Sequence, residues 1–349
     1  MASTSTHLPE RIEDIEQLEY MISQPAPYVL ETLKKLPGDV IVLGAGGKMG
    51  PSLSRMIKRA FEQIGSNHRV IGVSLFPSKN LESQMNAWGI ETIDCDLTDI
   101  DRLNRLPDAP NVIYMVGMKF GSTENEPMTW ALNTLLPVDI CRKYRNSRIV
   151  AFSTGNIYGM VPVAAGGSRE PDPPNPDGEY AMSCLGRERA FEYFSETMGI
   201  PISIIRLNYS IEMRYGVLVD LAQQVFADKP IDVSMGNVNV IWQADANAMA
   251  IASLAHASSP SFILNVTGPE ILSVRQVCEG FGRLMNKKVE FVGREATDAL
   301  LNNAQKAHQL FGPPRVGIEQ MMKWIADWVS RGGETLGKPT HFEARDGKF

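Results

Sequence analysis

The chain has 349 residues, 44% of them hydrophobic, with 34 lysines and arginines against 40 aspartates and glutamates. This size fits one large α/β domain with a smaller companion, and the apolar fraction argues against disorder as the main state. The formal net charge of -6 argues against a nucleic-acid partner. No apolar run approaches the roughly 18 residues that span a membrane. The first residues lack an apolar segment, and four scattered cysteines suggest reduced thiols, so we expect a cytoplasmic protein.

The first half of the chain predicts alternating strands and helices. Hydrophobic periodicity indicates a helical extension over residues 8–36, broken at Pro25 and Pro27 and ended by Pro37-Gly38. Short apolar runs typical of buried parallel strands follow, separated by helix-length segments. The strands are expected at 39–43, 69–75, 91–95, 111–116 and 148–152, and the helices at 51–61, 81–88 and 126–145. Such alternation predicts an α/β fold with a doubly wound parallel sheet.

The second half is more mixed. A loop rich in proline and glycine over 161–178 precedes a helix at 179–198 and a strand at 202–207. Further helices are expected near 217–227, 244–257 and 273–285, and Ser273 is a plausible N-cap for the last of these. The expected units are a helical extension (1–37), a cofactor-binding domain (38–210), a mainly substrate-binding domain with some return to the sheet (211–330) and a surface tail (331–349).

A glycine-rich loop, GAGGKMG, lies between the first predicted strand and the next helix. Glycines at 44, 47 and 50 permit a sharp turn and a close approach of the backbone to a diphosphate. The helix N-terminus adds N–H groups and partial positive charge. The strand and helix on either side favour a nicotinamide dinucleotide site over a turn without a ligand. The loop residues expected to bind the cofactor are Gly44, Gly46, Gly47, Lys48, Met49 and Gly50.

The end of the second strand lacks the acid that would bind the ribose diol of NAD, and Ser74 stands there instead. Serine does not repel a 2′-phosphate, and Lys48 or Lys79 would attract one, so NADP is expected as readily as NAD. At the end of the third strand, Asp96 is a candidate to accept a hydrogen bond from the adenine amine. Capping of the following turn is the alternative role for Asp96.

Several motifs follow one another at family-like spacing: Gly44-x-x-Gly47-x-x-Gly50, Asp96-Leu97, VIYMVG at 112–117, Asn133, STGNIYG at 153–159 and YAMS at 180–183. In order and spacing they resemble the extended short-chain dehydrogenase/reductase superfamily, in its NAD-dependent epimerase/dehydratase branch. The resemblance covers about residues 39–330. It implies a Rossmann-type sheet, a smaller C-terminal α/β substrate domain, and an enzyme acting on a sugar or nucleotide sugar. It also adds Leu97, Val116, Gly117, Asn133 and Cys184 to the expected cofactor site.

The same resemblance implies catalytic roles. Tyr180 takes the position of the tyrosine that removes the hydroxyl proton, and Thr154, beside Ser153, takes that of the residue that orients this hydroxyl. A lysine normally follows the tyrosine by four residues, on the same helix face, and lowers the pKa of the phenol. This chain has Cys184 there, and a neutral thiol cannot do the same. Lys119 resembles a lysine of UDP-galactose 4-epimerases that lies close to the cofactor, and is the candidate for the missing charge.

Other residues carry weaker expectations. Arg187 is a second source of positive charge, although it lies two turns along the helix from Tyr180. Arg206 and Asn208 follow the strand that leads into the substrate domain. Beyond them, Arg214 and Trp242 are candidates to grip a phosphate or stack on a ring. Each also fits an ordinary structural role. The sparse histidines and the lack of Cys-x-x-Cys predict no metal site.

Two functions stay open. The first is an NAD(P)-dependent oxidoreductase or epimerase acting on a secondary alcohol of a sugar or nucleotide sugar. Gly155 and Asn156 replace the acids found there in sugar 4,6-dehydratases, so a dehydratase is disfavoured. The second is a redox-silent NAD(P)-binding sensor or scaffold that has lost the tyrosine–lysine pair. The resemblance also implies a homodimer, formed by the helices near 126–145 and 179–198.

Overall fold

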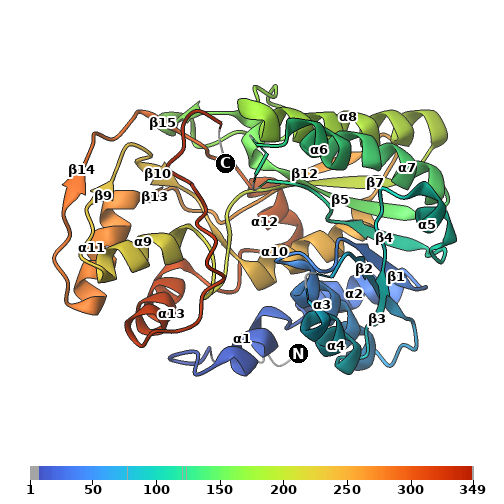
Figure 1. The fold of residues 1–349 in the computed structure, drawn as a ribbon, viewed down its shortest axis with the longest axis horizontal. Coiled ribbons are helices and arrows are strands. Elements are labelled where there is room, and N and C mark those ends of the chain that lie inside the picture. Colours follow the sequence, from blue (N-terminus) through green and yellow to red (C-terminus); the bar gives the residue numbers. More distant parts are fainter. Residues whose placement is uncertain (1–7, 77, 120, 123, 348–349) are drawn as a thin grey trace.

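The computed structural model describes residues 8–76, 78–119, 121–122 and 124–347 (Figure 1). The start of the predicted extension and the last two residues of the predicted tail therefore lie outside the described residues. A seven-stranded sheet forms the centre, in the order β12-β7-β5-β4-β1-β2-β3, and every neighbouring pair in it is parallel. Its strands are β1 (Val40–Leu43), β2 (Val70–Ser74), β3 (Glu91–Asp94), β4 (Asn111–Tyr114), β5 (Arg148–Thr154), β7 (Ile202–Leu207) and β12 (Phe262–Val266).

Helices cover both faces of the sheet, and further helices lie in the smaller half of the molecule. They are α1 (Ile15–Ile22), α2 (Pro27–Lys35), α3 (Gly50–Gln63), α4 (Lys79–Ala87), α5 (Ile100–Arg105), α6 (Glu126–Trp130), α7 (Leu136–Lys143), α8 (Gly178–Met198), α9 (Val217–Phe226), α10 (Gln243–Ala252), α11 (Val274–Met285), α12 (Gln305–Phe311) and α13 (Ile318–Ser330). A turn of π-helix, η1 (Ala131–Leu135), joins α6 to α7. No helix within the described residues has the length and hydrophobicity needed to cross a membrane.

Two hydrophobic cores explain the layers. Alternate residues of a strand point to opposite faces, and in β1 both sets are apolar and fully buried. Val40 and Val42 pack with α2, α3 and α10, whereas Ile41 and Leu43 pack with α5, α7 and α8. This arrangement confirms the predicted doubly wound parallel sheet.

Strand order reverses between β1 and β4, which are neighbours in space but not in the chain. In a doubly wound sheet, the crevice at the carboxyl ends of such strands is the usual ligand site. The loop after β1 begins at Gly44 and the segment after β4 begins at Met115, so both predicted cofactor segments lie at this crevice.

The smaller half contains α9, α11, α13 and short strands (Figure 1). These strands are β6 (Val161–Pro162), β8 (Ser210–Ile211), β9 (Ile231–Asp232), β10 (Asn237–Val238), β11 (Ile241–Trp242), β13 (Leu272–Ser273), β14 (Phe291–Val292) and β15 (Asp298–Ala299). The chain returns to the large sheet once, because β12 pairs with β7. Ser273 caps α11 as predicted, accepting a hydrogen bond from the Gln276 N–H at 3.3 Å.

The first and last segments of the described residues pack onto the rest of the molecule. Pro27 begins α2 rather than only interrupting a helix, because a proline in the first turn removes an N–H that has no helical partner. The predicted surface tail is wrong in part. Residues 331–339 are largely exposed, but Thr340 and Phe342 are each only 2% exposed. In Figure 1 the red C-terminal strap, residues 334–347, runs across the middle of the molecule.

Candidate functional site

Two adjoining cavities lie at the crevice between β1 and β4. The larger, about 810 Å³, extends from the glycine loop to the end of β2 and to Gly117. The smaller, about 180 Å³, is lined by Thr154 and Tyr180 among others. Lys48, Lys119 and Tyr215 line both cavities. The shared residues make the two cavities parts of one site.

The glycine loop fits a diphosphate. Gly44 has a φ of 88°, and a Cβ there would lie 3.0 Å from the backbone of Met115 and Val116. A Cβ on Gly50 would overlap the backbone of Ala45. The N–H groups of Gly44 and Ala45 donate to the Val73 carbonyl at 2.8 and 3.1 Å, which fixes the loop against β2. Gly44, Gly46, Gly47 and Lys48 line the larger cavity, and Met49 lines the smaller one.

The far end of the larger cavity fits a nucleoside. Its walls include Ser74 and Leu75 after β2, and Leu81, Gln84 and Trp88 from α4 and its end. Val116 and Gly117, two of the residues expected to bind the cofactor, also line this cavity. Together with the glycine loop, these walls accommodate an extended dinucleotide.

Some predicted cofactor residues lie away from the cavity walls. Asp96 accepts hydrogen bonds from the Thr98 N–H and hydroxyl at 2.9 and 2.7 Å, which lower the pKa of its carboxyl, so it caps a turn. Leu97 is buried in the core. Lys79 is exposed on α4 and does not line the cavity.

Thr154 and Tyr180 meet across the smaller cavity. The Thr154 hydroxyl accepts from the Asn156 N–H at 3.2 Å and hydrogen-bonds to Tyr180. Burial raises the pKa of Tyr180, as does its neighbour Cys184. Ser153 lines the same cavity, but its hydroxyl donates to Glu188 Oε1 at 2.5 Å. The phenol and the Thr154 hydroxyl thus lie together, whereas the Ser153 hydroxyl is directed to a buried carboxylate.

Cys184 is fully buried, and burial raises the pKa of its thiol. Arg187, three residues further along the same helix, is also buried. It donates to the Phe152 carbonyl at 2.8 Å and to Asn133 Oδ1 at 2.5 Å. Asn133 also donates to the Met118 carbonyl and the Ser183 hydroxyl. Asn133 and Arg187 therefore brace the segment after β4, and neither lines the two cavities.

Lys119 is a cation near the phenol, in addition to Arg187, whose charge lowers the pKa of Tyr180. Its Nζ is 6.0 Å from the centre of the Tyr180 ring and 3.4 Å from the Thr340 carbonyl oxygen, to which it donates. Burial lowers the pKa of Lys119 to about 8, although the Asp220 carboxylate opposes this. Asp220 in turn accepts from the Thr340 N–H and hydroxyl at 2.8 and 2.6 Å, which ties the C-terminal strap to α9.

Lys48 is a second buried amine at the junction. Its Nζ donates to the Ser210 carbonyl at 3.0 Å and lies 3.8 Å from the centre of the Tyr215 ring. Burial lowers the pKa of Lys48 to about 7, opposed by Glu212 and assisted by Lys119. Lys48 and Lys119 both lie where the two cavities meet, and burial makes the charged form of each amine unfavourable. An anionic group bound there would stabilise both charges, so this junction of the two cavities suits an anion.

Of the four remaining residues singled out in the sequence, two are buried in structural contacts and two line the cavities. Arg206 binds Glu188 through an ion pair at 2.8 Å between side chains that are 3% and 0% exposed, so it is a structural residue. Trp242 is buried, with its ring centre 5.6 Å from that of Trp324. Asn208 lines the smaller cavity and Arg214 the larger.

Sequence reasoning missed several cavity residues. Tyr209 and Ser210 contribute buried hydroxyls to the smaller cavity, and Thr340 joins them from the C-terminal strap. Glu19 and Ile22 of α1 line the larger cavity. A third cavity, about 290 Å³, shares Asn156 with the smaller one and is otherwise lined largely by residues 159–177 and 344–347. Tyr209 and Tyr215, which follow β7 in the chain, could have been found from the sequence as aromatic residues after a strand of the sheet. Glu19, Ile22 and Thr340 lie near the two ends of the chain and belong to no recognisable motif.

Comparisons with known proteins concern the family and the fold. Residues 40–210 match the model described as the NAD dependent epimerase/dehydratase family. No curated protein matches the sequence. The fold is similar to that of MoeE5, solved with UDP-glucose and NAD (TM-score 0.67, 17% identity, 84% of this chain and 99% of that chain). It is also similar to UDP-glucose 4-epimerase of Thermotoga maritima, solved with UDP-glucose (0.69, 14%, 84% and 99%), and to the dTDP-glucose 4,6-dehydratase DesIV of Streptomyces venezuelae (0.70, 15%, 84% and 97%).

Proposed function

Since the chain belongs to the NAD-dependent epimerase/dehydratase family, with whose model residues 40–210 align, we propose that it oxidises and reduces a secondary alcohol of a sugar or nucleotide sugar with NAD or NADP. One observation carries the proposal: Tyr180, Thr154 and Lys119 line one cavity that adjoins the glycine-loop cavity. When bound, the nicotinamide supplies the hydride acceptor and donor. The protein supplies binding, orientation and a proton carrier.

In this proposal the Thr154 hydroxyl orients the substrate alcohol toward Tyr180. The Tyr180 oxygen takes the proton of the substrate hydroxyl while the carbon that bears this hydroxyl gives up a hydride to the nicotinamide. When the hydride returns to that carbon, Tyr180 returns the proton and the alcohol is re-formed. Because the pKa of the Tyr180 phenol is raised, almost none of it is ionised at neutral pH, and little phenolate is present to accept the proton. In this proposal the Lys119 ammonium, 6.0 Å from the centre of the Tyr180 ring, favours the phenolate together with Arg187, whose charge lowers the pKa of the phenol.

Two features support a polyhydroxylated substrate. The hydroxyls of Tyr209 and Ser210 are buried at the smaller cavity and have no hydrogen-bond partner among the described residues. Buried polar atoms of this kind are normally paired, so they suit a ligand with several hydroxyls. Two of the solved neighbours carry UDP-glucose. The third cavity, beyond Asn156, would then receive the nucleotide part.

The test is an assay of the purified protein with UDP-glucose, UDP-glucuronic acid and dTDP-glucose, each with NAD and with NADP. We expect a 4-epimer in the proton NMR spectrum, or a reduced-nicotinamide absorbance band after the sugar is added. Binding of the dinucleotide without either signal from any of these sugars would favour the second function.

That second function is a redox-silent NAD(P)-binding sensor or scaffold. The observation that favours it is Cys184, which is buried at the position four residues after Tyr180 and contributes to raising the pKa of the phenol. A substitution of Lys119 distinguishes the enzyme from the redox-silent protein, because only the enzyme needs the Lys119 charge for turnover.

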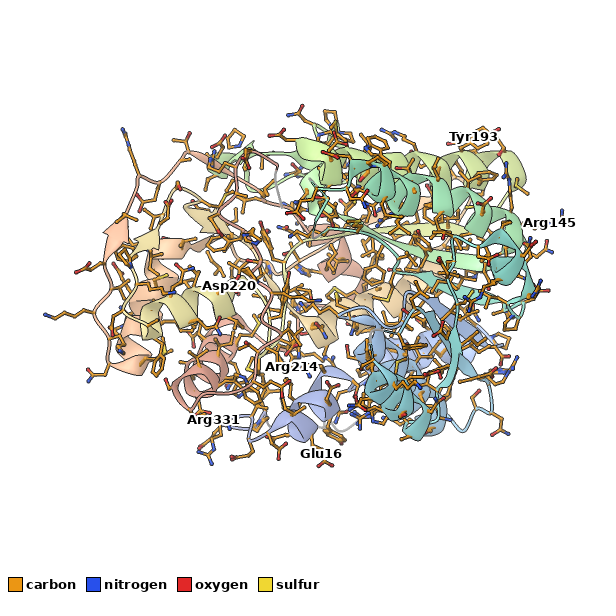
Figure 2. The ribbon with its side chains drawn as sticks, viewed as in Figure 1. Glu16, Arg145, Tyr193, Arg214, Asp220 and Arg331 are labelled. Atoms are coloured by element: carbon orange, nitrogen blue, oxygen red, sulfur yellow. The ribbon has the colours of Figure 1, made fainter. Side chains whose placement is uncertain are left out.

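We also propose a homodimer formed through α6, η1, α7 and α8. Figure 2 shows Tyr193 on the outer side of α8. Large apolar side chains are exposed on these helices: Met128, Trp130, Leu135, Met182 and Tyr193. Exposed apolar side chains on neighbouring helices support an interface here.

The dimer is tested at its most exposed apolar position, Leu135, which is 63% exposed. In sedimentation velocity the wild type is expected as a dimer and Leu135→Glu as a monomer, because the interface cannot bury an unpaired carboxylate. Leu284→Glu, on α11, is the matched control and is expected to stay dimeric. A monomeric wild type, or a dimeric Leu135→Glu variant, would contradict this interface.

A further inference from the structure

We propose that Glu19, on the N-terminal helix α1, belongs to the dinucleotide site and accepts a hydrogen bond from a ribose hydroxyl of the cofactor. This role is otherwise expected of an acid at the end of β2, where the chain has Ser74. The inference rests on the proposed function, because it takes the larger cavity as the dinucleotide site. It makes the site selective for NAD over NADP.

The position of Glu19 is unusual for a glutamate. The residue is only 9% exposed, yet it lines the larger cavity, which also contains Ser74 and the glycine loop. Its Oε1 accepts from Arg214 Nη1 at 2.8 Å. Its Oε2 is buried and has no hydrogen-bond partner among the described residues. A buried carboxylate oxygen left unpaired is costly, so this atom marks a place for a donor on a ligand.

Helix α1 holds this carboxylate firmly. Leu18 and Ile22 are buried in the core, and Arg59 Nη1 donates to the Tyr20 carbonyl at 2.7 Å and to the Ser23 hydroxyl at 3.0 Å. Figure 2 shows Arg214 on the side of α1 that faces the middle of the molecule, whereas Glu16 lies on the outer side. Glu19 is therefore positioned before any ligand binds.

The chemistry of the dinucleotide decides what faces Glu19. A carboxylate accepts hydrogen bonds and repels phosphate, so hydroxyl groups are the suitable donors. Glu19 lines the same cavity as Ser74 at the end of β2 and Leu81 of α4, near which the adenosine ribose of a dinucleotide lies in a doubly wound sheet. Lysines and Arg214 also line this cavity, but Arg214 is already paired with Glu19. An NADP 2′-phosphate would bring a second negative charge to this cavity.

The test is a fluorescence titration of the full chain with NADH and with NADPH, so that the ratio of the two affinities is measured within one protein. The wild type is expected to bind NADH roughly tenfold or more tightly than NADPH, as for a hydrogen bond to a charged group. Glu19→Gln is expected to reduce this ratio toward one, and Glu19→Asp, which keeps the charge, to retain part of it. Glu16→Gln is the matched control and should keep the wild-type ratio.

The outcomes separate this inference from the proposed function. An unchanged ratio in Glu19→Gln, with both affinities lowered equally, would show that Glu19 only anchors α1, and this would overturn the inference alone. A wild type that prefers NADPH would do the same. Failure of the wild type to bind either dinucleotide would overturn the proposed function as well.

Discussion

Replacing Tyr180 with phenylalanine is expected to lower kcat by about 10²–10⁴-fold and to leave the affinity for the dinucleotide within about threefold of the wild type. The substitution removes only the hydroxyl that hydrogen-bonds to Thr154 at the smaller cavity. Without it, no group at that position carries the alcohol proton. The measurement is steady-state turnover of the sugar that proves active, together with an NADH fluorescence titration.

Tyr193→Phe is the matched control for this prediction. Tyr193 lies on the same helix, α8, but is 61% exposed and far from the chemistry (Figure 2). Its loss of a hydroxyl should leave kcat unchanged. Turnover by Tyr180→Phe at more than half the wild-type rate would exclude Tyr180 as the proton carrier.

Replacing Lys119 with methionine is expected to lower turnover at pH 7 by about 10–10³-fold, because an opposite charge at this range shifts a pKa by roughly one to three. The ammonium favours the Tyr180 phenolate, whose own pKa is raised by burial. In the wild type, the rate should rise with pH while the phenol deprotonates and level off near pH 8, where Lys119 loses its charge. The variant should rise steadily with pH and show no break there.

Lys119→Arg is the control, since it restores a charge that does not titrate below pH 12. Its rate should recover in part and its profile should lack the break near pH 8. A Lys119→Met variant with the wild-type rate and profile would assign Lys119 an ordinary structural role and would favour the redox-silent function.

Sequence patterns predicted which segments of the chain meet at the two cavities. The carboxyl ends of parallel strands meet at one edge of a sheet, so the segments after β1, β4 and β5 had to converge. The glycine loop follows β1, Lys119 lies five residues after β4, and Thr154 ends β5. Tyr180 lies in the first turn of α8, which packs on β5. These are local signals whose meeting is dictated by the topology.

Side-chain partners could not be predicted in the same way. Arg206 pairs with Glu188, which lies on another element 18 residues earlier. Thr340 and Glu19 come from opposite chain ends that carry no motif, yet both line the site. Arg214 links these ends, because its carbonyl accepts from the Leu336 N–H at 3.0 Å and its guanidinium binds Glu19. Such contacts follow from packing and not from spacing along the chain.

The central claim is that the backbone at the start of α3 holds the diphosphate of a nicotinamide dinucleotide. The most direct measurement is a crystal structure of the protein grown with saturating NAD. We expect the diphosphate over residues 46–49 and the nicotinamide at the junction beside Lys119, within reach of Tyr180. A dinucleotide bound elsewhere, or a glycine-loop cavity closed by side chains at saturating NAD, would contradict it.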